Sequence, residues 1–174
     1  MENLKYPVGH FDWSLDVSKA EREQAIRTIA AYPAKLRNAV SPLNDTQLDT
    51  PYRQEGWTVR QVVHHLVDSH MNAYIRFKLA LTEDTPTIKP YDQAEWAKLP
   101  DNKLDPGISL VLIDGIHKRW VTIMDYMSET EWNRGFIHPE HNAFQELKKV
   151  AAMYAWHGEH HLAHITRLME RMGW

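Results

Sequence analysis

Apolar residues recur at steps of three and four positions along most of the 174-residue chain, and glycine is scarce, with seven in all. This spacing matches the 3.6-residue turn of an α-helix, in which residues three and four apart share a face. The pattern therefore predicts an all-α protein made of long amphipathic helices.

A capping box marks the start of the first long helix. Ser18 and Glu21 stand in the Ser-x-x-Glu arrangement, in which each side chain satisfies the other residue's backbone N–H. We expect this helix to run to about Val40, because Ser41-Pro42 disfavours its continuation. Pro33 lies inside that span and predicts a kink or a break.

Three further long helices are expected, each after a start signal. In chain order, the three signals are a second capping box, an Asp N-cap followed by a first-turn proline, and an Asn-x-x-Gln pattern. The predicted spans are about 58–82 from Thr58-x-x-Gln61, 105–127 from Asp105-Pro106, and 142–172 from Asn142-x-x-Gln145.

Residues 83–105 carry no long periodic pattern and contain three prolines. A connection of this length is uncommon unless it has a function or a short helix of its own, and Asp92-x-x-Glu95 with Trp96 could cap one. It is long enough to cross the bundle, so the second and third helices need not be antiparallel neighbours. We therefore predict one domain, 1–174, folded as a four-helix bundle with this long crossover connection.

Composition excludes several functions. Lys and Arg number 20 against 23 Asp and Glu, and a net charge of −3 gives no basis for nucleic-acid or anionic-membrane binding. No apolar run is long enough to span a membrane, and the first residues lack a signal-peptide pattern. The chain has no cysteine, which excludes thiolate ligands and a protein thiol nucleophile and is compatible with a cytoplasmic location.

Four histidines lie close together in the last predicted helix: His157, His160, His161 and His164. Residues four apart share a face, so His157/His161 and His160/His164 are two pairs that could each offer two imidazoles to one ion. His161 falls within the apolar stripe and His157 at its edge, whereas His160 should be more exposed and His164 intermediate. This geometry favours the first pair as metal ligands. The competing interpretation is ordinary core or surface histidines.

A third ligand has to come from another helix, and the second predicted helix offers three histidines. His70 lies in the middle of the apolar stripe, where a buried, hydrogen-bonded core histidine is the simplest interpretation. His65 lies on a polar stripe with Asn72 and Arg76, which is either solvated surface or the wall of a pocket. Periodicity does not choose between His65 and His70. Asn72 and Arg76 are the candidate substrate contacts.

A zincin site is excluded, because it requires His-Glu-x-x-His and the residue after His157 is Gly158. Glu159 projects almost opposite His157 and is interpreted as a surface charge. The remaining histidines are isolated in the sequence and are not expected to be ligands: His10, His117, His138 and His141.

Several segments resemble the DinB superfamily, and most closely its YfiT-like branch of metal-dependent hydrolases. The similarity extends from about Tyr6 to Trp174. It is carried by the segments 48–53, 56–66, 68–72, 74–79, 89–92 and 156–165, including Val62-Val63-His64-His65 and the His-x-x-x-His that follows Trp156. The resemblance implies a four-helix bundle, often homodimeric, with one divalent metal per subunit held by three histidines.

Carried over onto this sequence, the resemblance implies that the ligands are His65, His157 and His161. Zinc is the expected ion, with nickel as the alternative. A homodimer receives modest support from Ile75 and Leu79, which lie off the main apolar stripe of the second helix.

Three histidines without a fourth protein ligand are typical of a catalytic site with an open coordination position. The first functional hypothesis is a metal-dependent hydrolase that activates water for attack on a small-molecule substrate. The second is a thiol S-transferase, because relatives of this branch are linked to bacillithiol-type chemistry in which a low-molecular-weight thiol is the nucleophile. The third is a metal-binding stress protein without turnover.

Overall fold

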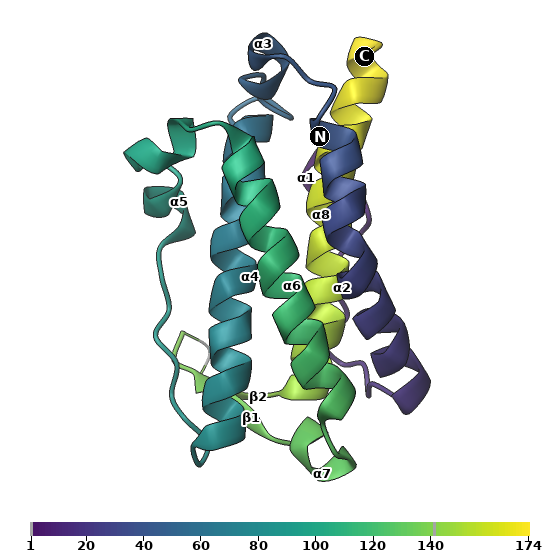
Figure 1. Ribbon diagram of the computed structural model, residues 1–174, viewed down its shortest axis with the longest axis vertical. Helices are drawn as coiled ribbons and strands as arrows, with labels where there is room; N and C mark the ends of the chain where they lie inside the picture. Colours follow the sequence, from purple (N-terminus) through teal and green to yellow (C-terminus); the bar gives the residue numbers. More distant parts are fainter. Residues whose placement is uncertain (1, 141) are drawn as a thin grey trace.

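Four long helices form a bundle in the computed structural model, which describes residues 2–140 and 142–174. They are α2 (Lys19–Val40), α4 (Val59–Thr82), α6 (Pro106–Tyr126) and α8 (Leu147–Met172). The predicted bundle is therefore confirmed. Helices α2 and α8 run in one direction, and α4 and α6 run in the other, so consecutive α4 and α6 are parallel neighbours (Figure 1). His141, one of the histidines not expected to be a ligand, lies outside the described residues.

The parallel order of α4 and α6 depends on the long connection between them. This segment returns along the bundle before α6 begins (Figure 1), as the crossover prediction requires. It contains two short helices, α5 (Gln93–Trp96) and the 3₁₀ helix η1 (Pro100–Lys103). The Asp92 side chain caps α5 by accepting hydrogen bonds from the backbone N–H groups of Ala94 and Glu95.

The predicted helix starts at Ser18, Thr58 and Asp105 are confirmed. Both capping boxes are complete, with the Glu21 carboxylate accepting from the Ser18 N–H at 2.8 Å and the Gln61 side chain accepting from the Thr58 N–H at 3.0 Å. Asp105 caps α6 ahead of its first-turn proline. The remaining short helices are α1 (Glu2–Lys5), α3 (Asp45–Leu48) and α7 (Glu129–Trp132).

Of the kink or break predicted at Pro33, the break is wrong, because α2 continues through this residue as one helix. Proline has no N–H, so the carbonyl of Ile29, four residues earlier, lacks its usual helical donor. The Nδ1 atom of His117 on α6 lies 2.7 Å from that carbonyl oxygen and donates to it instead. A side chain from a neighbouring helix thus satisfies the backbone group that the proline leaves open.

The predicted start of the last helix at Asn142 is also wrong. Residues Ala143–Glu146 form strand β2, which pairs antiparallel with β1 (Gly135–His138), with Gly135 opposite Glu146. Because the backbone of this segment is used in strand pairing, α8 begins only at Leu147, and its N-cap Glu146 makes no side-chain capping bond. Its end at Met172 is as predicted, with Gly173 in the left-handed conformation at φ +70°.

The bundle interior has two hydrophobic clusters at different heights. One contains Tyr32, Leu66, Ile113 and Ile165, and the other contains Ile29, Phe77, Trp120, Phe136 and Tyr154. His70 of α4, His117 of α6 and the four histidines of α8 lie at sequence positions between the two clusters. His65 lies beside the first cluster and faces His157 and His161, so these histidines together form a polar layer across the interior. In the part of the chain that the structure describes, no helix is long and apolar enough to cross a membrane.

Candidate metal centre

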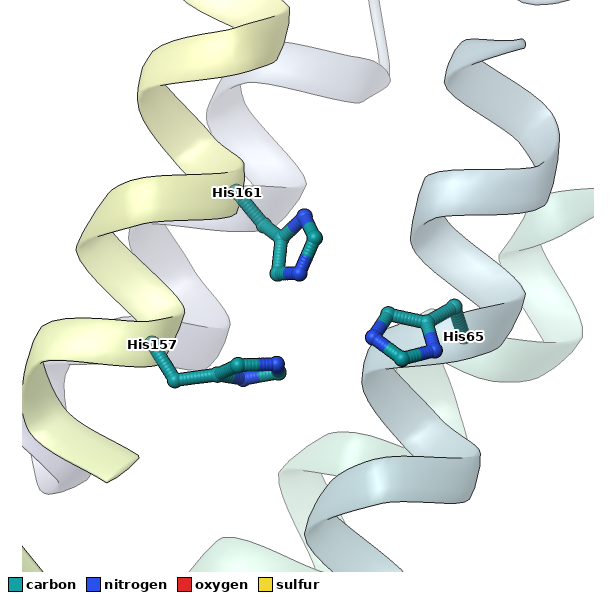
Figure 2. Close-up of side chains that lie close together, drawn as sticks. All are labelled: His65, His157 and His161. Carbon is teal, nitrogen blue, oxygen red and sulfur yellow. The ribbon is translucent and has the colours of Figure 1, made fainter. Parts of the chain in front are cut away.

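Three histidines from two helices face one another in the polar layer. His65 comes from α4, and His157 and His161 come from successive turns of α8 (Figure 2). Each offers one nitrogen, and the three nitrogens lie within 4.8 Å of one another. The ring centroids are 4.6 Å apart for His157 and His161, 4.9 Å for His65 and His161, and 5.5 Å for His65 and His157. The structure therefore brings together the three residues predicted as ligands.

Burial keeps these imidazoles neutral. His65 and His161 are buried, and His157 is half-buried. Loss of hydration lowers the pKa of His65 to about 4 and lowers the pKa of His157 and His161 well below the ordinary value. Neutral imidazole is the form that coordinates zinc-like metals, so three such nitrogens converging at one point fit a divalent ion.

His70 and His117 continue the layer behind His157. The Nε2 atom of His70 lies 3.3 Å from Nδ1 of His157, and Nδ1 of His70 lies 2.8 Å from Nε2 of His117. The prediction of His70 as a buried, hydrogen-bonded core histidine is confirmed. His117, isolated in the sequence and not expected to be a ligand, belongs to neither grouping of candidate ligands but is buried beside His70. Periodicity could have shown its interior position, because His117 falls on the stripe between Ile113 and Trp120.

A cavity of about 430 Å³ opens beside this group, and two of the three histidines line it. His157 and His161 line it together with His160, His164 and aromatic residues that include Tyr6 and Trp57. The expected exposure of His160 is wrong, because its ring is stacked on Trp156 and approached by Tyr6 and is only 7% exposed. Helical periodicity could not reveal that Tyr6 packs near His160, since Tyr6 comes from the distant N-terminal segment.

His160, His161 and His164 form a second grouping of nitrogens within 4.8 Å. The Nδ1 atoms of all three are buried without a hydrogen-bond partner. Nε2 of His164 is 3.2 Å from the Lys5 carbonyl, which can only accept, so that nitrogen carries the proton. This grouping shares His161 with the first and takes all its members from α8, whereas the first joins α4 to α8.

A second cavity, of about 490 Å³, adjoins the first, because Gln93 lines both. Arg76, a predicted substrate contact, lines it with Ser69, Tyr91 and Tyr154. Asn72, the other predicted contact, donates its side-chain N–H to the carbonyl of Asp68 at 2.8 Å and is not among the lining residues of either cavity. The structure therefore places Arg76, but not Asn72, at the wall of a cavity.

Sequence reasoning passed over one titratable group of this region, Asp68. It is half-buried on α4, and burial raises the pKa of its carboxyl to about 6. Its position three residues after His65 on the same helix was an available signal. Glu159, by contrast, pairs with Lys35 at 2.6 Å, consistent with its interpretation as a surface charge.

Comparison with known proteins gives the family. The sequence profile of the DinB superfamily matches residues 28–165. The chain is 49% identical over 173 residues to "Putative metal-dependent hydrolase YfiT" of Bacillus subtilis (strain 168), covering 99% of this chain and 97% of the relative. It is 51% identical over the full length of both chains to a protein of the same description from Bacillus mycoides (strain KBAB4).

The fold comparison agrees with the sequence comparison. The solved structure of YfiT from Bacillus subtilis superimposes on this chain with a TM-score of 0.96, and the alignment covers 99% of each chain at 49% identity. That protein is described as a probable metal-dependent hydrolase with an unusual four-helix bundle topology. The parallel pairing of α4 and α6 described above is thus shared with a solved relative. The chain belongs to the DinB superfamily and is similar to its YfiT-like members.

Proposed function

We propose that this protein is a metal-dependent hydrolase of small molecules, with one divalent ion held by His65, His157 and His161. Zinc is the first candidate for the ion and nickel the second, because both suit imidazole ligands. The observation that carries the proposal is the convergence of three neutral imidazoles from two helices, two of which, His157 and His161, line a cavity. The description of the similar Bacillus proteins as metal-dependent hydrolases supports it.

The donor set suits catalysis better than structural metal binding. Among the described residues, no fourth histidine or carboxylate joins the grouping of His65, His157 and His161, and the chain has no cysteine. A three-histidine site leaves a coordination position for a small molecule, whereas structural zinc sites are closed by four protein ligands. When bound, the ion would supply Lewis acidity, which activates a water or thiol nucleophile and polarises a substrate carbonyl or phosphoryl group.

The residues around the site would bind and orient the substrate. The first cavity gives access to His157 and His161 between aromatic walls that include Tyr6, Tyr52 and Trp57. Arg76, at the wall of the adjoining cavity, is the proposed contact for a polar or anionic part of the substrate. Asn72 uses one amide N–H within α4 and retains its second N–H and its carbonyl oxygen for such a contact.

One experiment separates hydrolysis from thiol transfer. The zinc- and nickel-loaded protein is incubated with a panel of esters, amides, phosphoesters and other electrophiles, with and without low-molecular-weight thiols, and products are followed by mass spectrometry. A hydrolase needs only metal and water and loses turnover in His65→Ala. The neighbouring His64→Ala serves as the control, because His64 bonds instead to Ser109 and the Leu104 carbonyl.

If products form only when a thiol is present and disappear in His65→Ala, the reaction is metal-dependent S-transfer and not hydrolysis. Equal turnover in wild type and His65→Ala would contradict metal-dependent catalysis at this site.

A further inference from the structure

A line of hydrogen bonds runs from the backbone of α2 to the proposed metal ligand His157. It begins at the Ile29 carbonyl, passes through His117 and His70, and ends at Nδ1 of His157, with separations of 2.7, 2.8 and 3.3 Å. His70 and His117 are each only 1% exposed. Tyr32 stacks against both rings, with centroids 5.8 Å away, so the line is enclosed by protein.

The carbonyl at the start fixes the direction of every bond in this line. A carbonyl oxygen can only accept, so Nδ1 of His117 must carry a proton, which leaves Nε2 of that neutral ring as an acceptor. Nδ1–H of His70 then donates to His117, and Nε2 of His70 becomes an acceptor in turn. Nδ1–H of His157 donates to it, and Nε2 of His157 is left with a free lone pair.

The proton count is consistent with three neutral rings. Three hydrogen bonds need three protons, and three neutral histidines carry one ring proton each. The arrangement therefore needs no charged imidazole in the interior, where an unpaired charge would be costly. It assigns the same tautomer, protonated at Nδ1, to all three histidines.

Pro33 explains why this acceptor is available. In an ordinary helix the Ile29 carbonyl would accept from the N–H of residue 33, but proline has none. The proline in α2 therefore presents an acceptor toward α6, at the height of the polar layer. Helices α2 and α6, which contribute no proposed ligand, are in this way connected through His70 to His157 on α8.

We infer that His70 and His117 are positioning residues that hold His157 in one ring orientation and one tautomer, with Nε2 bare and directed toward His65 and His161. This inference rests on the proposed function, because it takes His157 as a ligand. Hydrogen bonds to the second nitrogen of a ligating histidine fix its tautomer and orientation, and the loss of such a partner typically reduces metal affinity about 10- to 100-fold.

The first test reads the tautomers in the metal-free protein. Long-range proton–nitrogen NMR on histidine labelled with ¹⁵N distinguishes Nδ1–H from Nε2–H rings at neutral pH, and single substitutions assign the signals. We expect Nδ1–H at His70, His117 and His157. In His117→Leu, His70 loses its acceptor and should shift toward Nε2–H, and His157 should follow. A proton on Nε2 of His157 in the wild-type protein would overturn the inference.

The second test measures zinc affinity by competition with a chromophoric chelator. We expect His70→Leu and His117→Leu to bind zinc about 10- to 100-fold more weakly than wild type. His70→Gln keeps an amide oxygen as an acceptor for His157 and should recover part of the loss. His64→Leu is the matched control, since it also removes a buried histidine that joins α4 to α6, through Ser109, but lies outside the line.

The two tests separate this inference from the proposed function. Wild-type affinity in His70→Leu, or an equal loss in His64→Leu, would show that His70 does not position the ligand. If the tautomers are as expected but wild type binds no divalent metal, the hydrogen-bonded line stands while the metal site and the role assigned to it are both rejected.

Discussion

At the scale of single residues, His65 and His70 show what periodicity can and cannot decide. Both lie on α4 and both are buried, and the apolar pattern alone left either as a candidate ligand. The resemblance to the DinB superfamily selected His65, and the structure places it with His157 and His161, whereas His70 lies behind His157. His65 faces both His157 and His161, whereas His70 bonds to His157 from behind and to His117 of α6, and a pattern within one helix contains no information about such contacts.

Single substitutions should identify the metal ligands directly. We expect His65→Ala, His157→Ala and His161→Ala each to lose most of the bound metal, because two imidazoles hold a divalent ion far less well than three. Metal content of the purified proteins, measured by elemental analysis, checks this.

Two neighbouring histidines provide matched controls for that series, namely His64→Ala and His160→Ala. Both should keep nearly full metal content, since neither belongs to the grouping of His65, His157 and His161. Loss of metal in His160→Ala with full content in His157→Ala would shift the site to the second grouping on α8.

At the scale of elements, helix starts were predictable where the signal is local. Ser18 and Thr58 cap their helices through bonds to residues three positions later, and such bonds are visible in the sequence. Asn142-x-x-Gln145 has the same local form, but Gln145 lies opposite Phe136 in the hairpin. Strand pairing across the hairpin outweighed the capping signal, and nothing in the short motif could show it.

The contact between α2 and α8 depends on Gly158, beside His157. A Cβ atom at Gly158 would lie 2.9 Å from the Tyr32 ring, so we expect Gly158→Ala to force the two helices apart. The unfolding free energy should fall by about 1–3 kcal/mol, as for other overpacked cores, and zinc affinity should fall as well. Urea unfolding and chelator competition measure the two effects.

Gly115→Ala is the control for that substitution. Gly115 is an exposed glycine within α6, and a Cβ there would meet no atom within 4 Å. Because alanine favours helix over glycine by up to about 1 kcal/mol, this variant should be slightly more stable than wild type. Equal stability of the two alanine variants would show that the Tyr32 contact does not constrain α8.

At the scale of the whole molecule, the buried histidines make stability depend on pH. Burial lowers the pKa of His65, His117, His160 and His164 to about 4, from a reference value of 6.5. Between these values the unfolded chain binds protons that the folded chain does not, so the unfolding free energy falls as pH decreases from about 6.5 to 4. Asp68, with its pKa raised to about 6, has the opposite effect but is a single group.

Urea unfolding of the metal-free protein between pH 4 and 7 should show this decline. Each buried histidine contributes a slope of up to about 1.4 kcal/mol per pH unit. His160→Gln removes one such group, so its profile should be shallower than that of wild type. A stability that is constant over this range would contradict the assignment of neutral, buried imidazoles.

The molecule is predicted to be a homodimer. Ile108, Val111 and Leu112 lie at i, i+3 and i+4 on α6 and are 46–65% exposed, and Met71 and Ile75 are exposed on the neighbouring α4. An apolar surface of this kind is typical of a subunit interface. Light scattering at micromolar concentration should give twice the 20.4 kDa of one chain.

A charge in this surface should dissociate the dimer. Val111→Glu is expected to give the mass of one chain, whereas Tyr126→Glu, at the exposed end of the same helix, should remain dimeric. A single-chain mass for the wild-type protein would reject the prediction.

The placement of the three candidate ligands along the chain also affects how the bundle assembles. His157 and His161 are one turn apart in α8, whereas His65 lies far earlier, before the long connection that leads to α6. An unfolded chain can therefore offer two imidazoles to an ion as soon as one turn of α8 forms, and the ion offsets part of the cost of nucleating that turn. The third imidazole arrives only when α4 docks, so metal present during folding favours an order in which α8 forms first.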